Sequence, residues 1–559
     1  STAYPAGIAM AATWDADLER QVGESIGREA RGRGVHIMLG PGVNIYRAPM
    51  AGRDFEYFGE DPFLASRMAV AWIDGVQSQG VMATVKHFVA NNQEYDRHNA
   101  SSDIDERTLR EIYLPAFEAA VREAHVGAIM DSYNPINGMH ATQNAHTNIE
   151  IAKKDWGFPG LIMSDWDATY DGVAAANGGL DLEMPSGKFM NRATLLPAVR
   201  DGRVSQATID DKVRRILREE IRFGFLDREQ QDLSIPNWNQ QARAIALRGA
   251  QESMVLLKNE GPLLPLQASR IRSIAVIGPD AHPAVTQGGG SAHVNPITSV
   301  SFLQGIGNHV GSATKVFYSP GEPDLRTAVD QSQFSTAGIP GLKGEYFNNA
   351  NLEGAPALTR TDRRIDFHWP NGYASNAPQD FSVRWTGTFH AANAGDYRAW
   401  LEGEHLFRLY VDDKLVVDRW SGGETTHQSF IVAPLTLSAG DHSIRLEEHS
   451  TPRGWLSSAD KPSIAFAFLP VADVVPADAV KMAAGADVAI VCIGFDRYSE
   501  SEGFDRTFAL PGFQDDLIRA IVAVNKNTVV VLTAGGDVDM TRWLDRVPAL
   551  VHAWYPGQE

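Results

Sequence analysis

The stretch Gly160-Leu161-Ile162-Met163-Ser164-Asp165-Trp166 decides how the first part of this chain folds. Its short apolar run predicts a buried parallel strand, which places Asp165 and Trp166 where that strand leaves the core. In a barrel of parallel strands, this end is where chemistry is done. An aspartate at this position could stabilise a cation, attack an anomeric carbon, bind a metal or only cap the next helix, and the segment alone leaves these alternatives open.

Length and composition indicate a multidomain globular protein. The chain has 559 residues, 43% of them hydrophobic and 21% charged, which is too long for one core and too apolar for disorder. A net charge of −19 argues against nucleic-acid binding. No apolar run reaches the roughly 18 residues that would span a membrane. The single cysteine, Cys492, lies in an apolar run and is expected to be a core thiol, so no internal disulfide is expected.

Residues 1–226 alternate short apolar runs with helical patterns, which is typical of a parallel sheet with crossover helices. The expected strands cover residues 35–39, 81–85, 127–130 and 161–163. Apolar residues at helical spacing predict helices over 109–121 and 209–221, the second with Ser205 as its cap. We therefore expect a (β/α) barrel catalytic domain, irregular in places and without its N-terminal segment.

The rest of the chain predicts an α/β sandwich domain interrupted by an inserted all-β sandwich. Residues 227–270 are expected to form a linker, residues 271–340 to form the first part of the α/β domain, and residues 471–559 to form its second part. This second part is expected to be truncated, because a domain rarely ends on the Pro-Gly turn that follows residues 547–551. Between them, 341–470 contain short strands, among them a hairpin of 406–411 and 414–418 around Asp412-Asp413. An insertion at a surface loop explains this order.

The candidate chemistry lies in carboxylates that follow strands. His36, His87 and His98 lack metal-ligand spacing, and dinucleotide, phosphate-loop and nucleophile-elbow motifs are missing, so neither a metal nor a cofactor is expected. Asp165, Glu500 and Glu502 all lie in turns after apolar runs. Hydrolysis of a glycosidic bond needs two such groups, one to protonate the leaving oxygen and one to attack or to activate water. Carboxylates on separate domains could meet across a cleft.

An ordered series of motifs along nearly the whole chain closely resembles the family 3 glycoside hydrolases. The motifs are Gly52-Arg53-Asp54-Phe55-Glu56, Gly59-Glu60-Asp61-Pro62, Lys86-His87-Phe88, Ser132-Tyr133-Asn134, Ser164-Asp165-Trp166 and Glu502-Gly503-Phe504-Asp505-Arg506. Within this family, the chain is similar to β-glucosidases with an inserted protective-antigen-type β-sandwich. Gly344-Glu345-Tyr346-Phe347, Val383-Arg384-Trp385 and Asp412-Asp413-Lys414-Leu415 resemble the patterns of that module.

The resemblance implies roles for individual residues. Asp165 would be the nucleophile and Glu502 would be the acid/base, with Glu500 as the alternative acid/base. A retaining mechanism then implies that the two carboxyl groups lie about 5 to 5.5 Å apart. It also implies that the pKa of the acid is raised. The residues implied to bind the sugar are Arg53, Lys86, His87, Arg97, Tyr133 and Trp166. The family usually adds an aspartate from a segment before Ser1.

Most of these assignments have a structural alternative. Asp165 could only cap the next helix, and Glu502 could belong to a solvated loop, while Arg97 is placed only by its spacing after Lys86-His87-Phe88. Arg53 could be held in an ion pair by Glu56 or Asp54, and Lys86 and His87 could form a solvated strand end. Tyr133 and Trp166 could be core aromatics.

The resemblance implies an exo-acting, retaining β-glucosidase that removes terminal β-D-glucose from short oligosaccharides or from aryl and alkyl glucosides. A β-xylosidase or mixed-specificity glycosidase, and a non-catalytic carbohydrate-binding protein, are the alternatives. The expected partner is a small carbohydrate, with no nucleic acid and no membrane, and a homo-oligomer is left open. A periplasmic or secreted location is a family expectation only.

Overall fold

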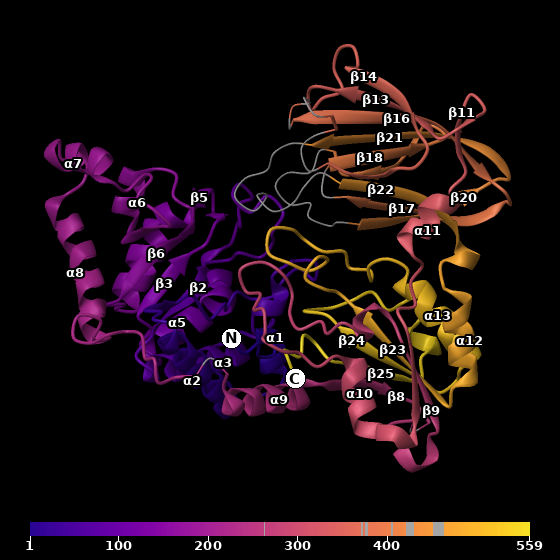
Figure 1. Ribbon diagram of the computed structural model, residues 1–559. Coiled ribbons are helices and arrows are strands. Elements are labelled where there is room, and N and C mark those ends of the chain that lie inside the picture. Colours follow the sequence, from indigo (N-terminus) through magenta and orange to yellow (C-terminus); the bar gives the residue numbers. More distant parts are fainter. Residues whose placement is uncertain are drawn as a thin grey trace.

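The first half of the chain forms a curled sheet of five parallel strands (Figure 1). The computed structural model describes all residues except 237, 262, 370–372, 375–377, 379, 404–405, 421–429 and 451–462. The sheet has the order β1-β2-β3-β6-β7, which is the order along the chain. Its strands are β1 (Ile37–Met38), β2 (Met82–Phe88), β3 (Ala128–Asp131), β6 (Leu161–Trp166) and β7 (Leu182–Met184).

This sheet is open rather than closed into a full barrel. All strand pairs in it are parallel, and β2 and β3 are buried along their whole length, as the apolar runs predicted. Among the described residues, β1 and β7 each pair with only one neighbour and not with each other. The predicted barrel is therefore present as a half-barrel, and β6 carries Asp165 to its carboxyl end, where the sequence placed it.

Helices with side-chain caps cover this sheet. Ser205 accepts a hydrogen bond from the Thr208 amide and begins α8, as predicted. The helix expected over 109–121 is divided into a π-helical turn (Leu109–Tyr113) and α5, which begins at Pro115 because proline suits the first turn of a helix. The helices of this half are α1 (Gly7–Ala12), α2 (Ala16–Gly32), α3 (Pro62–Ser78), α4 (Glu106–Thr108), α5 (Pro115–Arg122), α6 (Gly172–Gly178), α7 (Arg192–Arg200) and α8 (Gln206–Arg222).

A second, six-stranded sheet has the order β10-β9-β23-β24-β25-β8. Five of its strands are parallel, and β8, which lies in the range expected as a linker, pairs antiparallel with β25. The strand order reverses between β9 and β23, and ligands bind outside the carboxyl ends of strands at such a switch point. The strands are β8 (Val255–Asn259), β9 (Ser273–Ile277), β10 (Lys315–Ser319), β23 (Val488–Gly494), β24 (Thr528–Thr533) and β25 (Ala549–His552).

The helices of the second half are α9 (Gln240–Ser253), α10 (Phe302–Val310), α11 (Leu325–Gln331), α12 (Ala477–Gly485) and α13 (Gln514–Val524). Cys492 is fully buried in β23, and burial raises the pKa of its thiol, consistent with the inert core cysteine that was predicted. Within the described part of the chain, no helix is both long and apolar enough to cross a membrane.

Between α11 and α12 the described residues form two antiparallel sheets, drawn in orange in Figure 1. Buried side chains of both sheets, such as Trp385 and Phe466, belong to one core cluster. The predicted hairpin is present as β18 and β19, and Asp412 and Asp413 turn the chain with positive φ angles. The strands are β11 (Phe334–Thr336), β12 (Ile339–Pro340), β13 (Leu342–Phe347), β14 (Leu358–Asp362), β15 (Asp366–His368), β16 (Phe381–Ala391), β17 (Gly395–Gly403), β18 (Leu406–Val411), β19 (Lys414–Asp418), β20 (Phe430–Leu437), β21 (Gly440–Ser450) and β22 (Ser463–Pro470).

Candidate active site

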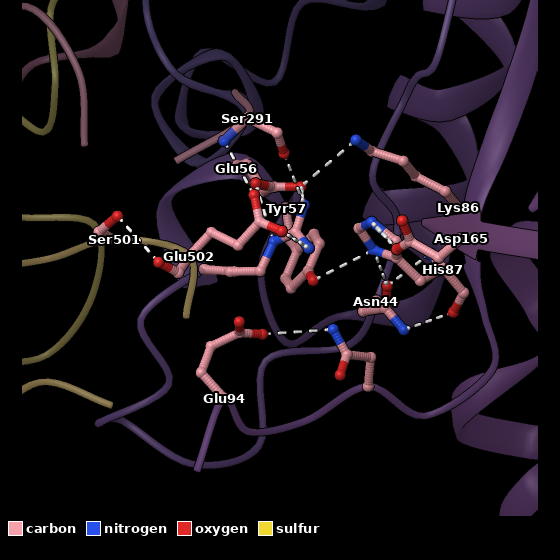
Figure 2. Close-up of polar contacts among 12 residues, drawn as sticks. Asn44, Glu56, Tyr57, Lys86, His87, Glu94, Asp165, Ser291, Ser501 and Glu502 are labelled. Carbon is pink, nitrogen blue, oxygen red and sulfur yellow. Dashed lines mark hydrogen bonds and ion pairs between the residues drawn. The ribbon is translucent and has the colours of Figure 1, made fainter. Parts of the chain in front are cut away.

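Polar side chains from the carboxyl ends of both parallel sheets meet in one place (Figure 2). The first sheet supplies the ends of β2 and β6 and the loops near them, and the second supplies the loops that follow β9 and β23. These are the positions where parallel sheets commonly hold ligands. The site therefore lies between the two halves of the protein.

Asp165 lies at the carboxyl end of β6, one residue before its last, and one of its carboxylate oxygens accepts a hydrogen bond while the other makes none with a described residue. Its Oδ1 accepts from the Trp166 amide at 2.7 Å, while Oδ2 is buried and makes no hydrogen bond with any described residue. Burial has the largest effect on the pKa of Asp165 and raises it. The negative charge of Glu502 also raises this pKa, whereas the positive charges of Arg53 and Lys86 lower it. Trp166 is half-buried and packs against the apolar cluster at the ends of the strands.

His87 faces Asp165 from the end of β2. Its Nε2 lies 3.6 Å from Asp165 Oδ2. On the other side of the ring, Nδ1 lies 3.3 Å from Asn44 Oδ1 and 3.4 Å from the Tyr57 hydroxyl. Burial, followed by the nearby cations Arg53, Lys86 and Arg97, lowers the pKa of His87 well below its usual value. The imidazole is therefore neutral at ordinary pH.

Arg53 is held by Glu56, as one of its structural alternatives proposed, yet it also reaches the site. Its Nε and Nη2 donate to the Glu56 carboxylate at 3.1 and 2.8 Å. Its Nη1 lies 3.4 Å from Glu502 Oε1 but is a buried atom without a hydrogen bond to any described residue. Lys86 approaches the same Glu56, with Nζ 4.0 Å from Oε1. Glu56 thus holds Arg53 by two hydrogen bonds and lies at ion-pair distance from Lys86.

Glu502 reaches the site from the loop after β23. Its Oε2 accepts from the Ser291 amide at 2.8 Å, and its Oε1 lies 3.0 Å from Arg97 Nη1. Burial raises the pKa of Glu502, but Arg53 and Arg97 oppose this more strongly, and the net pKa is below its usual value. The raised pKa expected for an acid is therefore wrong for this arrangement, because two guanidinium groups face the carboxylate.

Tyr133, in the loop after β3, lies under Arg97. The guanidinium carbon of Arg97 is 4.0 Å from the centre of the Tyr133 ring, a cation–π distance. Tyr133 is almost fully buried, and burial, assisted by the negative charge of Asp165, raises its pKa. It therefore lies close enough to Asp165 for their charges to interact, and it is more than a remote core aromatic.

Glu500, the alternative to Glu502, has a different environment. It is fully buried and lies 2.9 Å from Arg506 Nε, and it accepts from the Gly535 amide at 2.9 Å and the Tyr555 hydroxyl at 2.6 Å. These contacts join the second sheet to its own loops. Its geometry is that of a structural ion pair, whereas Glu502 faces Arg53 and Arg97.

The structure thus brings seven of the eight predicted residues into contact or charge interaction with one another, and Trp166 adjoins Asp165 along the chain. The sequence reading assigned no role to Asn44, Tyr57, Glu94 or Ser291, which hold the predicted residues. The run Gly288-Gly289-Gly290 was a signal for Ser291. A side chain at Gly290 would lie 2.3 Å from Glu502 Cβ, so the glycine run permits the close backbone approach.

A cavity of about 450 Å³ adjoins this constellation and shares Glu56, Lys86 and Ser291 with it. The rest of its wall is mostly apolar, and Asp165 and Glu502 do not line it. In the part of the chain that the structure describes, no group of three or more His, Cys, Asp or Glu residues is arranged to hold a metal ion.

Comparisons with known proteins show the family of this chain. Residues 1–219 match the glycosyl hydrolase family 3 N terminal domain, and residues 254–559 match the glycosyl hydrolase family 3 C-terminal domain. The chain belongs to glycosyl hydrolase family 3.

Similar proteins are named as β-glucosidases. A β-glucosidase of Rhizobium radiobacter is 39% identical over 575 residues, covering 100% of this chain and 68% of the relative. A solved β-glucosidase from Kluyveromyces marxianus is 31% identical with a TM-score of 0.71, covering 100% of this chain and 70% of that one. One from Streptomyces venezuelae, in complex with D-glucose, is 32% identical with a TM-score of 0.73, covering 100% and 68%. The chain spans about two thirds of the length of these relatives.

Proposed function

We propose that this glycoside hydrolase is a retaining, exo-acting β-glucosidase with Asp165 as nucleophile and Glu502 as acid/base. The observation that carries the proposal is the buried Asp165 Oδ2, which makes no hydrogen bond with any described residue and lies close enough to the Glu502 carboxylate for their charges to interact. Similarity to proteins named β-glucosidases supports the substrate class. Retention requires two carboxyl groups with these two roles.

In the first step, Asp165 Oδ2 attacks the anomeric carbon while Glu502 gives a proton to the departing glycosidic oxygen. The C–O bond to the leaving group breaks as the ester bond to Asp165 forms, and the leaving group departs as an alcohol. The Trp166 amide holds Oδ1, so the attacking oxygen is the one that is free of protein hydrogen bonds. The neutral His87 offers a polar wall without adding a positive charge beside the nucleophile.

In the second step, Glu502 removes a proton from water, which attacks the anomeric carbon and releases Asp165. Esterification removes the negative charge of Asp165, and the loss of this charge favours the ionised form of Glu502 that a base requires. The acid form needed in the first step is favoured when a sugar enters, because its hydroxyl groups engage Arg53 and Arg97 and exclude water from Glu502.

The sugar-binding roles follow from the remaining donors. Arg53, Lys86 and Arg97 present N–H groups to a neutral polyhydroxyl ligand. Trp166 offers ring surface beside the nucleophile, and Tyr133 lies near the nucleophile beneath Arg97. We further propose that residues 341–470 form an inserted protective-antigen-type β-sandwich, since the described strands of this range make two antiparallel sheets with a shared core. The strands β11 and β12, which were expected to belong to the α/β domain, extend one of these sheets. A β-xylosidase uses the same carboxylates and differs in the walls around the sugar.

Reaction stereochemistry and rescue test this proposal together. Proton NMR of early hydrolysis of an aryl β-glucoside is expected to show the β-anomer of glucose first, and an aryl β-xyloside is expected to react more slowly. Asp165→Ala is expected to be inactive, whereas Glu502→Ala should still form the intermediate from a substrate with a good leaving group and regain turnover with azide. Initial α-glucose, or a Glu502→Ala enzyme that behaves as wild type, would overturn the mechanism; no hydrolysis of either glycoside would favour a carbohydrate-binding protein.

A further inference from the structure

Two loops from different halves of the protein hold each other by reciprocal hydrogen bonds. The Glu94 carboxylate accepts from the Gly503 amide at 2.8 Å. In return, the Asp505 carboxylate accepts from the amides of Glu94 at 2.7 Å and Tyr95 at 3.2 Å. Glu94 follows β2, and Gly503 and Asp505 belong to the loop that carries Glu502. The position of Glu502 is therefore fixed by the loop after β2, in the first half of the chain, as well as by its own domain.

Glu94 also shares a cation with Glu502. Arg97 Nη1 lies 2.7 Å from Glu94 Oε2 and 3.0 Å from Glu502 Oε1. One guanidinium nitrogen thus serves two carboxylates. Burial raises the pKa of Glu94, with Arg97 and Arg53 acting against it and Glu502 adding to it. In its ionised form, which Arg97 stabilises, Glu94 offsets part of the positive charge that Glu502 experiences. The side chain of Glu94 is 1% exposed, so water screens this interaction little.

The backbones of the two loops also lie close together. A side chain at Gly52 would lie 1.9 Å from the Phe504 carbonyl oxygen, so only glycine lets the two loops approach here. The Arg506 amide donates to the Met50 carbonyl at 2.8 Å on the same side. The segment that follows Glu502, residues 503–506, is therefore held against the first half of the chain.

We propose that Glu94 is a positioning residue for the acid/base, which anchors the backbone at Gly503 and draws Arg97 partly away from Glu502. This inference rests on the proposed role of Glu502. The charged and titratable groups around Glu502 are Arg53, Arg97, Glu94, Asp165 and Tyr133. Glu94 is the carboxylate among them that shares a hydrogen-bond donor with Glu502 and also holds the adjoining backbone.

A variant that removes the charge of Glu94 is expected to shift the pH dependence of kcat/KM in a defined direction. In Glu94→Gln, an oxygen remains to accept from Gly503, but the full charge of Arg97 acts on Glu502 and favours its ionised form. The acid must be protonated to work, so the alkaline limb of kcat/KM is expected to move to lower pH by about half a unit or more. Activity on a poor leaving group should fall about 10- to 100-fold, and on a good leaving group much less, because acid assistance matters less there.

The experiment compares pH profiles of wild type, Glu94→Gln, Glu94→Asp, Asp505→Asn and the matched control Asp96→Asn, on phenyl and 2,4-dinitrophenyl β-glucoside. Asp96 belongs to the same loop, and its side chain accepts from Asn99. Its variant should keep the wild-type profile. Asp505→Asn, which weakens the anchor without touching Arg97, and Glu94→Asp, which keeps the charge, should lower kcat without moving the limb.

The outcomes separate this inference from the proposed function. An alkaline limb in Glu94→Gln that stays at the wild-type pH, with Glu502→Ala rescued by azide, overturns the role of Glu94 and leaves the acid/base in place. A Glu502→Ala enzyme with the wild-type profile overturns the proposed function itself. If Glu94→Gln does not fold, the Glu94→Asp variant tests the proposal. An unchanged kcat of Glu94→Asp on phenyl β-glucoside would contradict a positioning role for Glu94.

Discussion

The guanidinium of Arg53 lies 3.4 Å from the carboxylate of Glu502, although the two residues come from different halves of the protein. Glu56 holds the other side of the same guanidinium through two hydrogen bonds. A planar fork can make both contacts at once, which a lysine ammonium cannot. Arg53 therefore connects the first half of the protein to the proposed acid/base.

Arg53→Lys is expected to lower kcat/KM on an aryl β-glucoside by about 100-fold, because one ammonium cannot hold Glu56 and face Glu502 and the sugar together. Steady-state kinetics measure this loss. The exposed Arg47, whose described contact is a cation–π distance of 5.8 Å to Tyr113, supplies the control Arg47→Lys, which should behave as wild type. Equal losses in both variants would contradict a specific role for Arg53.

Glu500→Gln is expected to destabilise the protein rather than to remove a catalytic group. It leaves Arg506 buried without its carboxylate partner, at a cost of about 3–5 kcal/mol in the free energy of unfolding. Denaturant unfolding measures this cost, and Glu502→Gln is the matched comparison, with a much smaller loss expected. A stable Glu500→Gln enzyme that needs azide for turnover would instead assign the acid/base role to Glu500.

His87 is expected to remain neutral across the working range of the enzyme. Burial and three nearby cations lower its pKa, so protonation should begin only well below the usual pH for histidine. Nitrogen NMR of labelled histidine, with His87→Gln used for assignment, should show a neutral imidazole at pH 6. A resonance that titrates near pH 6.5 would contradict the described environment.

Glu322 makes the stability of the second half depend on pH. Burial, with the charges of Asp496 and Glu402, raises its pKa to about 7. The folded protein thus retains a proton that the unfolded chain loses near pH 4.5, and stability falls as pH rises from about 4.5 to 7. The difference in the free energy of unfolding between pH 5 and pH 8 is expected to be about 1–3 kcal/mol smaller in Glu322→Gln than in the wild type. Denaturant unfolding at the two pH values measures this difference. An unchanged difference between the two pH values would refute it.

The sequence predicted the elements that depend on local pattern. The apolar run before Asp165, the cap at Ser205 and the hairpin around Asp412 are all present, because periodicity and turn chemistry act over a few residues. Whether the first sheet closes into a barrel depends on whether its edge strands pair with each other, which no local sequence pattern encodes. The sequence predicted a barrel, whereas the structure has an open sheet among the described residues.

The candidate site was only partly accessible to the same reasoning. Strand ends indicated Asp165, and the family resemblance supplied Arg53 and Arg97. The contacts of Glu502 join residues 211 and 405 positions apart, so neither the Ser291 amide nor the sharing of Arg97 with Glu94 could be read from spacing. The lowered pKa of Glu502 follows from these long-range contacts, which explains why the expected raised pKa was wrong.

The identity of the nucleophile is tested most directly by trapping the covalent intermediate. The enzyme is incubated with 2,4-dinitrophenyl 2-deoxy-2-fluoro-β-glucoside. The fluorine of this substrate slows both steps, but its good leaving group lets the first step proceed, so the glycosyl-enzyme accumulates. Peptide mass spectrometry is expected to find one fluoroglucosyl group on Asp165, and none in Asp165→Ala. A label on another carboxylate, or release of dinitrophenol by Asp165→Ala at the wild-type rate, would contradict the proposed role of Asp165.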